Sequence, residues 1–196
     1  MKEKDLRNPL PRSFYTRNPK KVACDLLGKR LVRVLNGALM ECIIVETEAY
    51  YGANDPASRA FYGKKNYNRL MWEEPGQVFI FNVHKYWMFN IIAHEYNQVG
   101  AVLIRALEPI RGLKTMYVNR SVNEKKELTN GPGKLTIALG ISKNVQGISV
   151  LKMDSLIRIT DTLIEPNIGT SRRIGVSKDL DQNLRFYIIG NPFTSR

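Results

Sequence analysis

Cysteine and histidine are scarce in this 196-residue chain, and the shortage of both argues against several kinds of site. Cys24 and Cys42 are the only cysteines, and His84 and His94 are the only histidines. They form neither a CxxC pair nor a spacing typical of zinc ligands. A catalytic Ser-His-Asp or Cys-His arrangement is equally poorly supported, because so few histidines are present to serve as the base. We expect both cysteines to be small core residues in a reducing compartment.

Long hydrophobic runs are also missing. No stretch of about 18 apolar residues could cross a membrane, and the N-terminal sequence MKEKDLRNPLPRSF lacks the apolar segment of a signal peptide. The sequence therefore predicts a soluble, intracellular protein that acts in the cytoplasm, or at the nucleoid if the source is prokaryotic.

Acidic residues are few relative to basic ones. Eighteen Asp and Glu stand against 30 Lys and Arg, which gives a formal net charge of +12. Such an excess indicates a polyanionic partner, and it favours nucleic acid over a membrane surface. A basic protein that is merely soluble is the alternative that composition alone leaves open.

The turn residues predict one folded domain over residues 18–196, preceded by a polar, basic arm over residues 1–17. The domain is expected to be α+β, with a largely antiparallel sheet flanked by helices. Its first helix has clear boundary signals, because Asn18 can cap it, Pro19 fits its first turn and Gly28 can end it.

Strands dominate the remaining pattern. Asn36-Gly37 between two β-rich runs predicts a hairpin. Pro109 is expected to end a strand and to begin a helix that runs to about Asn119. The other predicted elements are strands at 29–34, 39–50, 77–83, 100–107, 149–152, 156–161 and 185–189, a loop at 51–76 and a short helix at 134–138.

Two carboxylates stand on one predicted strand, in the stretch ECIIVETEAYYGANDP (residues 41–56). Strict alternation would place Glu46, Glu48 and Tyr50 on the same face. The face is either solvated, as in many sheets, or it presents a carboxylate that activates water or holds a metal. Alternation predicts one face with Ile43, Val45, Thr47 and Ala49, and the other with Ile44, Glu46, Glu48 and Tyr50.

A single arginine interrupts the apolar strand GAVLIRAL. A buried guanidinium is costly unless a carboxylate pairs with it. We therefore expect Arg105 to pair with Glu46 or Glu48. A structural ion pair and a catalytic pair are indistinguishable at this level.

The most aromatic segment is FIFNVHKYWMFN, residues 79–90. Core packing explains most of it, but His84 and Lys85 stand where the apolar run breaks. Aromatic and basic residues together suit stacking on bases and contact with phosphates. Asn90 is a polar group among bulky apolar neighbours, and it must find a partner or face a cavity.

A second phosphate-binding candidate is Asn130-Gly131-Pro132-Gly133-Lys134, which places small residues and a lysine at a predicted helix start. We mark Gly133 and Lys134 as candidate DNA-phosphate contacts. An ordinary loop and helix cap is the alternative, and the P-loop pattern GxxxxGK[ST] is absent.

These blocks, taken in order, resemble the alkyladenine (3-methyladenine) DNA glycosylase family. The similarity runs from about residue 12 to the C-terminus through VETEAYYG, DPAS, PGQVFIF, MFN, VLIRALEPIRGL, NGPGKL, RRIGV and LRFYIIGNPF. It implies a compact domain on a curved sheet. It also implies a monofunctional base-excision repair enzyme that flips alkylated or deaminated purines out of double-stranded DNA and hydrolyses the N-glycosidic bond. No metal, cofactor or lyase step is implied, and a monomer suffices.

The resemblance assigns roles residue by residue. Glu48 falls on the acid that activates water, and Arg105 on the arginine that helps to hold that water. Tyr50 falls on the tyrosine that stacks on the flipped base. Asn90 falls on the asparagine that disfavours the 2-amino group of guanine, and the backbone at Ile174 borders the water site.

Three positions depart from the family pattern. Arg59 stands where a histidine usually follows DPAS, and Phe81 replaces a tyrosine at the edge of the pocket. The chain is one residue shorter at the wedge that fills the gap left by the flipped base. It offers His84 there as the intercalating residue and Lys85 as a neighbouring phosphate contact.

Two rival functions follow from the same residues. One is a metal-dependent nuclease with Glu46 and Glu48 as ligands, which would need a divalent ion and would cut the backbone. The other is a non-catalytic, basic domain that binds damaged DNA in a salt-sensitive way.

Overall fold

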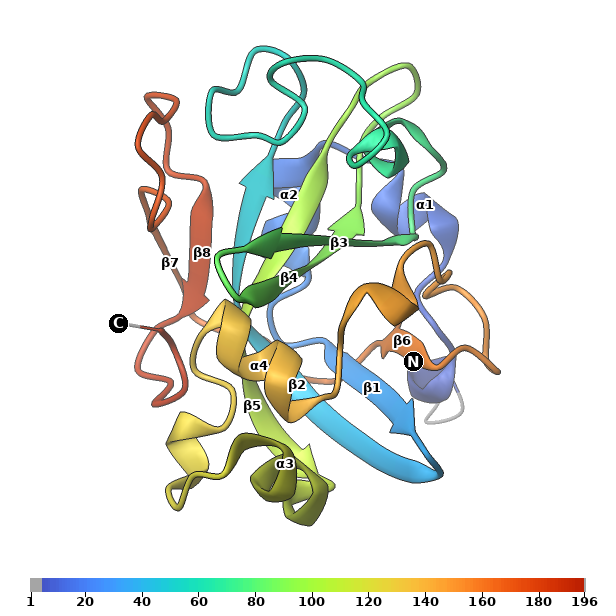
Figure 1. The fold of residues 1–196 in the computed structure, drawn as a ribbon, viewed down its shortest axis with the longest axis vertical. Coiled ribbons are helices and arrows are strands. Elements are labelled where there is room, and N and C mark those ends of the chain that lie inside the picture. Colours follow the sequence, from blue (N-terminus) through green and yellow to red (C-terminus); the bar gives the residue numbers. More distant parts are fainter. Residues whose placement is uncertain (1–4, 196) are drawn as a thin grey trace.

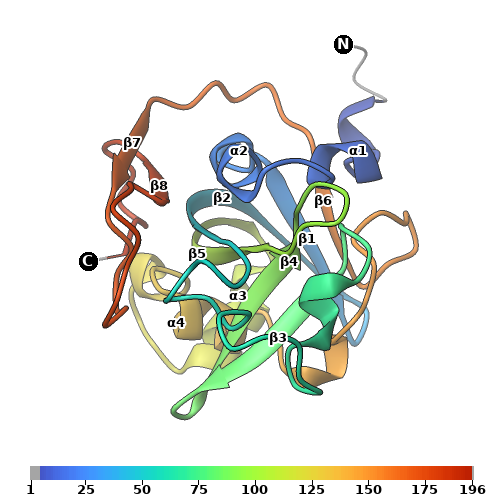
Figure 2. The ribbon, with the colours of Figure 1, turned by 90° about the horizontal axis from the view of Figure 1, so that it is seen from above.

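The computed structural model describes residues 5–195, and it is built on one curled antiparallel sheet (Figures 1 and 2). Six strands follow the order β3-β4-β5-β2-β1-β6, and β8 pairs with both β2 and β7. All the pairings are antiparallel, so the predicted α+β fold with a curved antiparallel sheet is confirmed. The strands are β1 (Arg30–Leu35), β2 (Ala38–Tyr50), β3 (Val78–Val83), β4 (Tyr86–Ile92), β5 (Ala101–Arg111), β6 (Ile157–Thr160), β7 (Ile168–Ser171) and β8 (Arg185–Ile188).

Short helices flank the sheet. They are the α-helices α1 (Arg12–Tyr15), α2 (Pro19–Asp25), α3 (Leu113–Arg120) and α4 (Pro132–Ala138), and the 3-10 turns η1 (Asp5–Arg7), η2 (Arg69–Trp72), η3 (Lys125–Glu127) and η4 (Lys143–Val145). No helix in residues 5–195 combines the length and the apolar character that a membrane span requires.

Local sequence signals set two of these elements correctly. The side chain of Asn18 accepts a hydrogen bond from the backbone N–H of Lys20, 3.0 Å away, and caps α2 as predicted. Asn36 and Gly37 both adopt positive φ angles, 48° and 79°, in the tight turn between β1 and β2. This is the left-handed pair that such a hairpin turn requires.

Three strand predictions were wrong. Strand β4 lies within residues 84–99, where the sequence predicts no strand, because its side chains are buried on both faces and show no alternation. Strand β7 was also missed. Residues 149–152 form no strand, although Ser149 makes an isolated bridge to Gln77.

Pro109 does not end its strand, which was a further incorrect prediction. Strand β5 continues through Pro109 to Arg111. On one side β5 pairs with β2 over this whole length, whereas β4 pairs only with Ala101–Leu103 on the other side. A proline that faces an edge without a strand partner removes no ladder hydrogen bond, so the strand tolerates it.

A bulge in β2 breaks the predicted alternation. The register with β5 shifts on both sides of Glu46, so that Ile44 lies opposite Leu107 and Glu46 opposite Ala106. Ile44 packs in the main core, while Val45 packs with a small cluster that includes Phe193. Alternation therefore holds for Glu46, Glu48 and Tyr50 but not across the whole strand. A bulge beside a pocket redirects side chains in this way.

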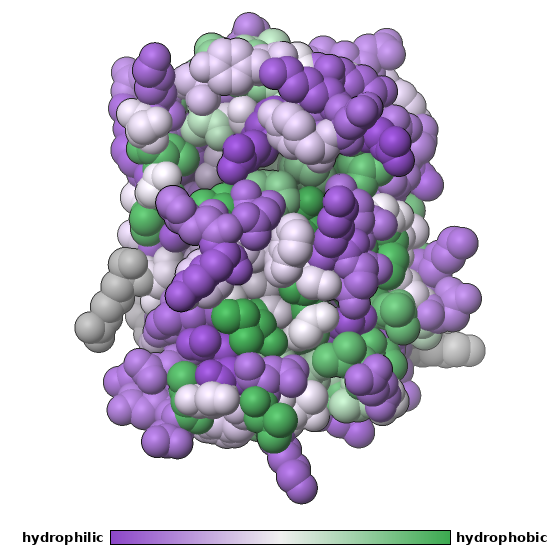
Figure 3. Space-filling view, in the orientation of Figure 1, coloured by the Kyte–Doolittle hydropathy of each residue, from purple (hydrophilic) through white to green (hydrophobic). Residues whose placement is uncertain are grey.

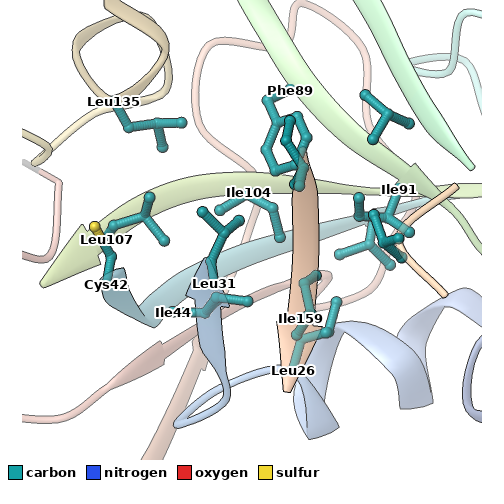
Figure 4. Packing of buried hydrophobic residues seen from close by; sticks show 14 of the residues in the cluster. Leu26, Leu31, Cys42, Ile44, Phe89, Ile91, Ile104, Leu107, Leu135 and Ile159 are labelled. Carbon is teal, nitrogen blue, oxygen red and sulfur yellow. The ribbon is translucent and has the colours of Figure 1, made fainter. Parts of the chain in front are cut away.

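The main core lies inside the curled sheet. Buried residues from α2, β1, β2, β4, β5 and α4 meet there, with Phe89 beside Ile104 (Figure 4). The segment before α2, which the sequence predicts as an arm, packs on this body over the part that the structure describes. Leu10 donates a backbone hydrogen bond to Ile159, and Tyr15 is fully buried. Residues 1–4 lie outside the described part.

Candidate active site

Glu48 lies near the end of β2, between β5 and β8, with Leu103 and Arg185 as its neighbours across the sheet. It is fully buried. Its Oε1 accepts a hydrogen bond from the backbone N–H of Ile174 at 2.8 Å, and its Oε2 accepts one from the hydroxyl of Tyr50 at 2.7 Å. These contacts fix the orientation of the carboxylate.

The environment also changes the acidity of Glu48. Burial raises its pKa above the ordinary value, and the negative charge of Glu46 acts in the same direction. Arg105, the N–H of Ile174 and the Tyr50 hydroxyl oppose this rise without cancelling it. A glutamate whose pKa is raised toward neutrality is suited to proton transfer.

Arg105 stands between the two glutamates. Its Nε donates to Oε1 of Glu46 at 2.9 Å, and its Nη1 lies 3.3 Å from Oε1 of Glu48. The predicted pairing of Arg105 with a glutamate of β2 is confirmed, and it involves both of them. Although burial opposes the charged form, the two carboxylates raise the pKa of Arg105, so this side chain stays cationic.

Glu46 accepts most of the hydrogen bonds in a buried network next to Arg105 and Glu48. Its Oε1 also accepts hydrogen bonds from Nε of Arg185 and Oγ of Ser195, both at 2.7 Å, and its Oε2 accepts one from the backbone N–H of Ser195 at 2.6 Å. Two arginines and one serine thus surround a carboxylate that solvent does not reach. Glu46 therefore holds Arg105 in place beside Glu48.

Tyr50 is supported by a third buried arginine of this site. The guanidinium carbon of Arg173 lies 4.5 Å from the centre of the Tyr50 ring. Arg173 itself is held by two hydrogen bonds to Asp55 at 2.7 Å and by Asp179. Runs of charged residues usually lie on a solvated surface. Arg173 and Arg185 are instead buried, because carboxylates distant in the sequence pair with them in the interior.

A cavity of about 520 Å³ opens over these residues. Tyr50, Arg105 and Ile174 line it. Phe81 and Arg59 line it too, and the guanidinium carbon of Arg59 lies 4.6 Å from the Phe81 ring centre. The two departures from the family pattern thus stack on each other, and they place a cation in the wall.

Asn90 also lines the cavity, and its orientation is fixed. Its amide nitrogen donates to the backbone carbonyls of Phe79 and Met88, both at 3.1 Å. Because carbonyl oxygens only accept hydrogen bonds, the nitrogen must face them. The side-chain oxygen is therefore the polar atom that Asn90 has left to offer.

The candidate wedge lies at the tip of the β3–β4 hairpin. His84 and Lys85 form the two-residue loop between Val83 and Tyr86, and both are exposed. His84 has a φ of 51°, which a non-glycine residue adopts only in tight turns. Val83, which precedes this loop, lines the cavity, whereas His84 and Lys85 do not, so their contacts with DNA stay predictions.

The start of α4 packs against the same hairpin beside its tip, where Tyr86 pairs with Val83. A Cβ on Gly133 would lie 2.8 Å from the ring of Tyr86, so glycine permits this close approach. Lys134 donates to the side chain of Asn130 at 2.8 Å. Packing therefore explains Gly133 by itself, and contact of either residue with phosphate stays a prediction.

The sequence argument missed part of this arrangement. Ser195 was not considered, and neither was the support that Arg173 gives to Tyr50. Asp55 lies in the block DPAS and Arg173 in the block RRIGV. Their place in these family-like blocks was the only feature of the sequence that pointed to them. Among residues 5–195, no group of three or more His, Cys, Asp or Glu side chains is arranged to hold a metal ion.

A buried acid and an arginine at the base of a cavity with aromatic walls suit hydrolysis of a bond to a flat ring. Comparison with known sequences agrees with this chemistry. A sequence model of the family described as methylpurine-DNA glycosylase (MPG) matches residues 13–192. The chain therefore belongs to the methylpurine-DNA glycosylase family, whose members are DNA-repair hydrolases that act on the N-glycosidic bond.

Similar proteins come from several organisms. A protein of Aeropyrum pernix named "Putative 3-methyladenine DNA glycosylase" is 40% identical over 193 residues, covering 95% of this chain and 93% of its own length. Proteins of the same name from Clostridium perfringens strain 13 and Natranaerobius thermophilus are 40% and 38% identical, and they cover 95% and 93% of this chain and 98% and 96% of their own lengths.

Proposed function

We propose that this protein is a monofunctional, monomeric glycosylase that flips alkylated or deaminated purines from duplex DNA into the cavity and hydrolyses the glycosidic bond. The observation that carries the proposal is the buried contact set of Glu48 with Tyr50, Ile174 and Arg105. It places an ionisable acid of raised pKa and a cation beneath an aromatic wall.

The flipped base stacks on Tyr50, with Phe81 and Arg59 on the opposite side. Flipping costs a few kcal/mol, and least for a damaged or poorly paired base. His84 offsets part of this cost by entering the gap in the stack. Asn90 presents its side-chain oxygen to the base and so influences which purines fit.

Water held by Glu48, Arg105 and the backbone at Ile174 then attacks C1′ of the sugar. The glycosidic bond breaks, its electron pair leaves with the base, and Glu48 takes a proton from the water. The negative charge of Glu48 also stabilises the positive charge that develops on the sugar. The products are the free base and an abasic site.

A test of the reaction class uses duplexes with one hypoxanthine, ethenoadenine or alkylated purine, incubated with the protein in EDTA. We expect free base and alkali-sensitive abasic sites without direct backbone cuts, and no adduct after borohydride treatment. Backbone cuts that need a divalent ion would show a nuclease instead. A trapped adduct would show a lyase step, and binding without base release would show a damage-binding domain.

Arg59 is expected to set the preference between charged and neutral lesions. A purine methylated at N7 or N3 carries a positive charge, whereas hypoxanthine is neutral. Two like charges about 4 Å apart repel by about 1 kcal/mol in water and more in a partly buried site. Replacing Arg59 by glutamine should therefore raise the rate of 7-methylguanine release relative to that of hypoxanthine release by about tenfold, since about 1.4 kcal/mol corresponds to a factor of ten.

The control is Lys20→Gln, which removes the same charge from an exposed residue of α2 that does not line the catalytic cavity. Single-turnover release of both bases gives the ratio for each variant. An unchanged ratio in Arg59→Gln would show that solvent screens the charge of Arg59 from the base.

A further inference from the structure

A second groove lies on the other side of the β3–β4 hairpin. It has a volume of about 670 Å³ and follows β3 between the segment that holds Tyr67 and Arg69 and the turn at Lys143–Gly147. Three cations line it, Arg59, Arg69 and Lys143, and no carboxylate does. All three are exposed, and none takes part in an ion pair within residues 5–195.

The hairpin lies between this groove and the catalytic cavity, and the two share Arg59, Tyr67 and Phe81 as lining residues. Successive side chains of a strand point to opposite faces. Val83 of β3 and Met88 of β4 line the cavity, whereas Ile80 and Asn82 of β3 and Trp87 of β4 line the second groove. Figure 2 shows the β3–β4 hairpin projecting from the body of the protein.

The edge of β3 at this groove is already occupied, which argues against an added peptide strand. The backbone N–H of Ile80 donates to the side chain of Gln146 at 2.5 Å. At the start of β3, Val78 exchanges backbone hydrogen bonds with Gly147 and Ile148. Strand addition requires a free edge, so a peptide lacks its usual means of binding here.

The surface around the groove suits a polar, negatively charged partner. The face in Figure 3, on which β3 lies in front, is mostly hydrophilic with small and separate hydrophobic areas. Unpaired cations with exposed aromatic neighbours are the means by which proteins hold a nucleic acid backbone.

We propose that this groove holds the undamaged strand of the duplex, while the cavity on the other side of the hairpin takes the damaged one. The inference rests on the proposed function, because it needs the hairpin tip at His84 to enter the duplex. With one strand on each side, Arg69 and Lys143 contact phosphates that a single-stranded substrate does not have. The groove is thus a feature that recognises duplex DNA.

The test is the double variant Arg69→Gln/Lys143→Gln. Its affinity is measured by fluorescence anisotropy at several salt concentrations, for a duplex and for the single strand that carries the same abasic-site analogue. We expect about tenfold weaker binding of the duplex. The slope of log K against log salt should fall in magnitude by about 1.8 for two lost phosphate contacts. Binding of the single strand should change less than twofold.

The control is Lys20→Gln/Lys21→Gln, which removes the same charge from exposed residues of α2, away from β3 (Figure 2). It should leave both affinities within twofold of the wild type. Equal losses on duplex and single strand, or no loss on either, would overturn the proposal even if the wild type releases base normally. A wild type that releases no base from any duplex would overturn the proposed function, and the groove proposal with it.

Discussion

Replacing Glu48 by glutamine is expected to lower the rate of base release by about 10²–10⁴-fold, the range in which a positioned general base contributes. Glutamine keeps the size of the side chain and an oxygen that can accept the hydrogen bond from Ile174. It cannot take a proton from water, and it brings no negative charge to the developing positive charge on the sugar. Single-turnover release from a hypoxanthine duplex in EDTA measures the loss.

The pH profile of the wild type gives a second test of the same role. Only ionised Glu48 can accept a proton, so the rate should fall as pH drops through its pKa. Because burial raises that pKa, the acidic limb should lie above the value of about 4.3 that is typical of an exposed glutamate. A rate independent of pH down to that value would assign the base to another group.

Loss of activity in Glu48→Gln should not arise from unfolding. A carboxyl group whose pKa is higher in the folded than in the unfolded chain stabilises the fold when protonated, and this stabilisation is lost as pH rises through the folded pKa. Glutamine is neutral at every pH, so the variant should melt at or above the wild-type temperature at neutral pH. Its advantage should shrink in acid. A lower melting temperature at neutral pH would contradict this account.

Replacing Glu46 by glutamine is expected to destabilise the fold by about 3–5 kcal/mol, because it breaks a buried ion pair and leaves two arginines short of a partner. In a domain of this size such a loss lowers the melting temperature by roughly 6–20 °C. The side-chain nitrogen of glutamine can only donate hydrogen bonds. It would face a group that also donates, namely Arg105, Arg185 or Ser195.

Glu41→Gln is the matched control on the same strand. Glu41 lies 3.9 Å from Arg30 and 3.8 Å from Arg111, and its side chain is 19% exposed. A pair of this kind contributes at most about 1 kcal/mol. Equal stability of the two variants would show that the network around Glu46 does not stabilise the fold.

Glu46→Gln also has a functional readout that loss of stability alone would not produce. The charge of Glu46 helps to raise the pKa of Glu48. Without it, and with Arg105 left to Glu48 alone, the acidic limb of the pH profile should move to lower pH. An unmoved limb would limit Glu46 to a structural role.

Much of the local structure could be predicted from a few adjacent residues. The cap at Asn18 and the turn at Asn36-Gly37 depend on backbone conformations that these residue types favour by themselves. The ordered blocks placed Glu48, Tyr50, Asn90 and Arg105 in one family, and the structure brings all four to one cavity or its base. Strand β4 was missed because a strand buried on both faces shows no alternation.

The burial of charge was decided by the tertiary structure alone. Ser195 meets Glu46 across 149 positions of the chain, and Arg173 meets Asp55 across 118. A charged side chain is buried only where the fold supplies an oppositely charged partner. No local sequence pattern shows which distant residues the fold brings together. The sequence thus predicted an acid, an aromatic residue and an arginine that the structure brings together. Only the tertiary structure shows the bulge in β2 that orients Glu46 toward Arg105. It also shows that Arg185 and Arg173, distant in the sequence, contact Glu46 and Tyr50.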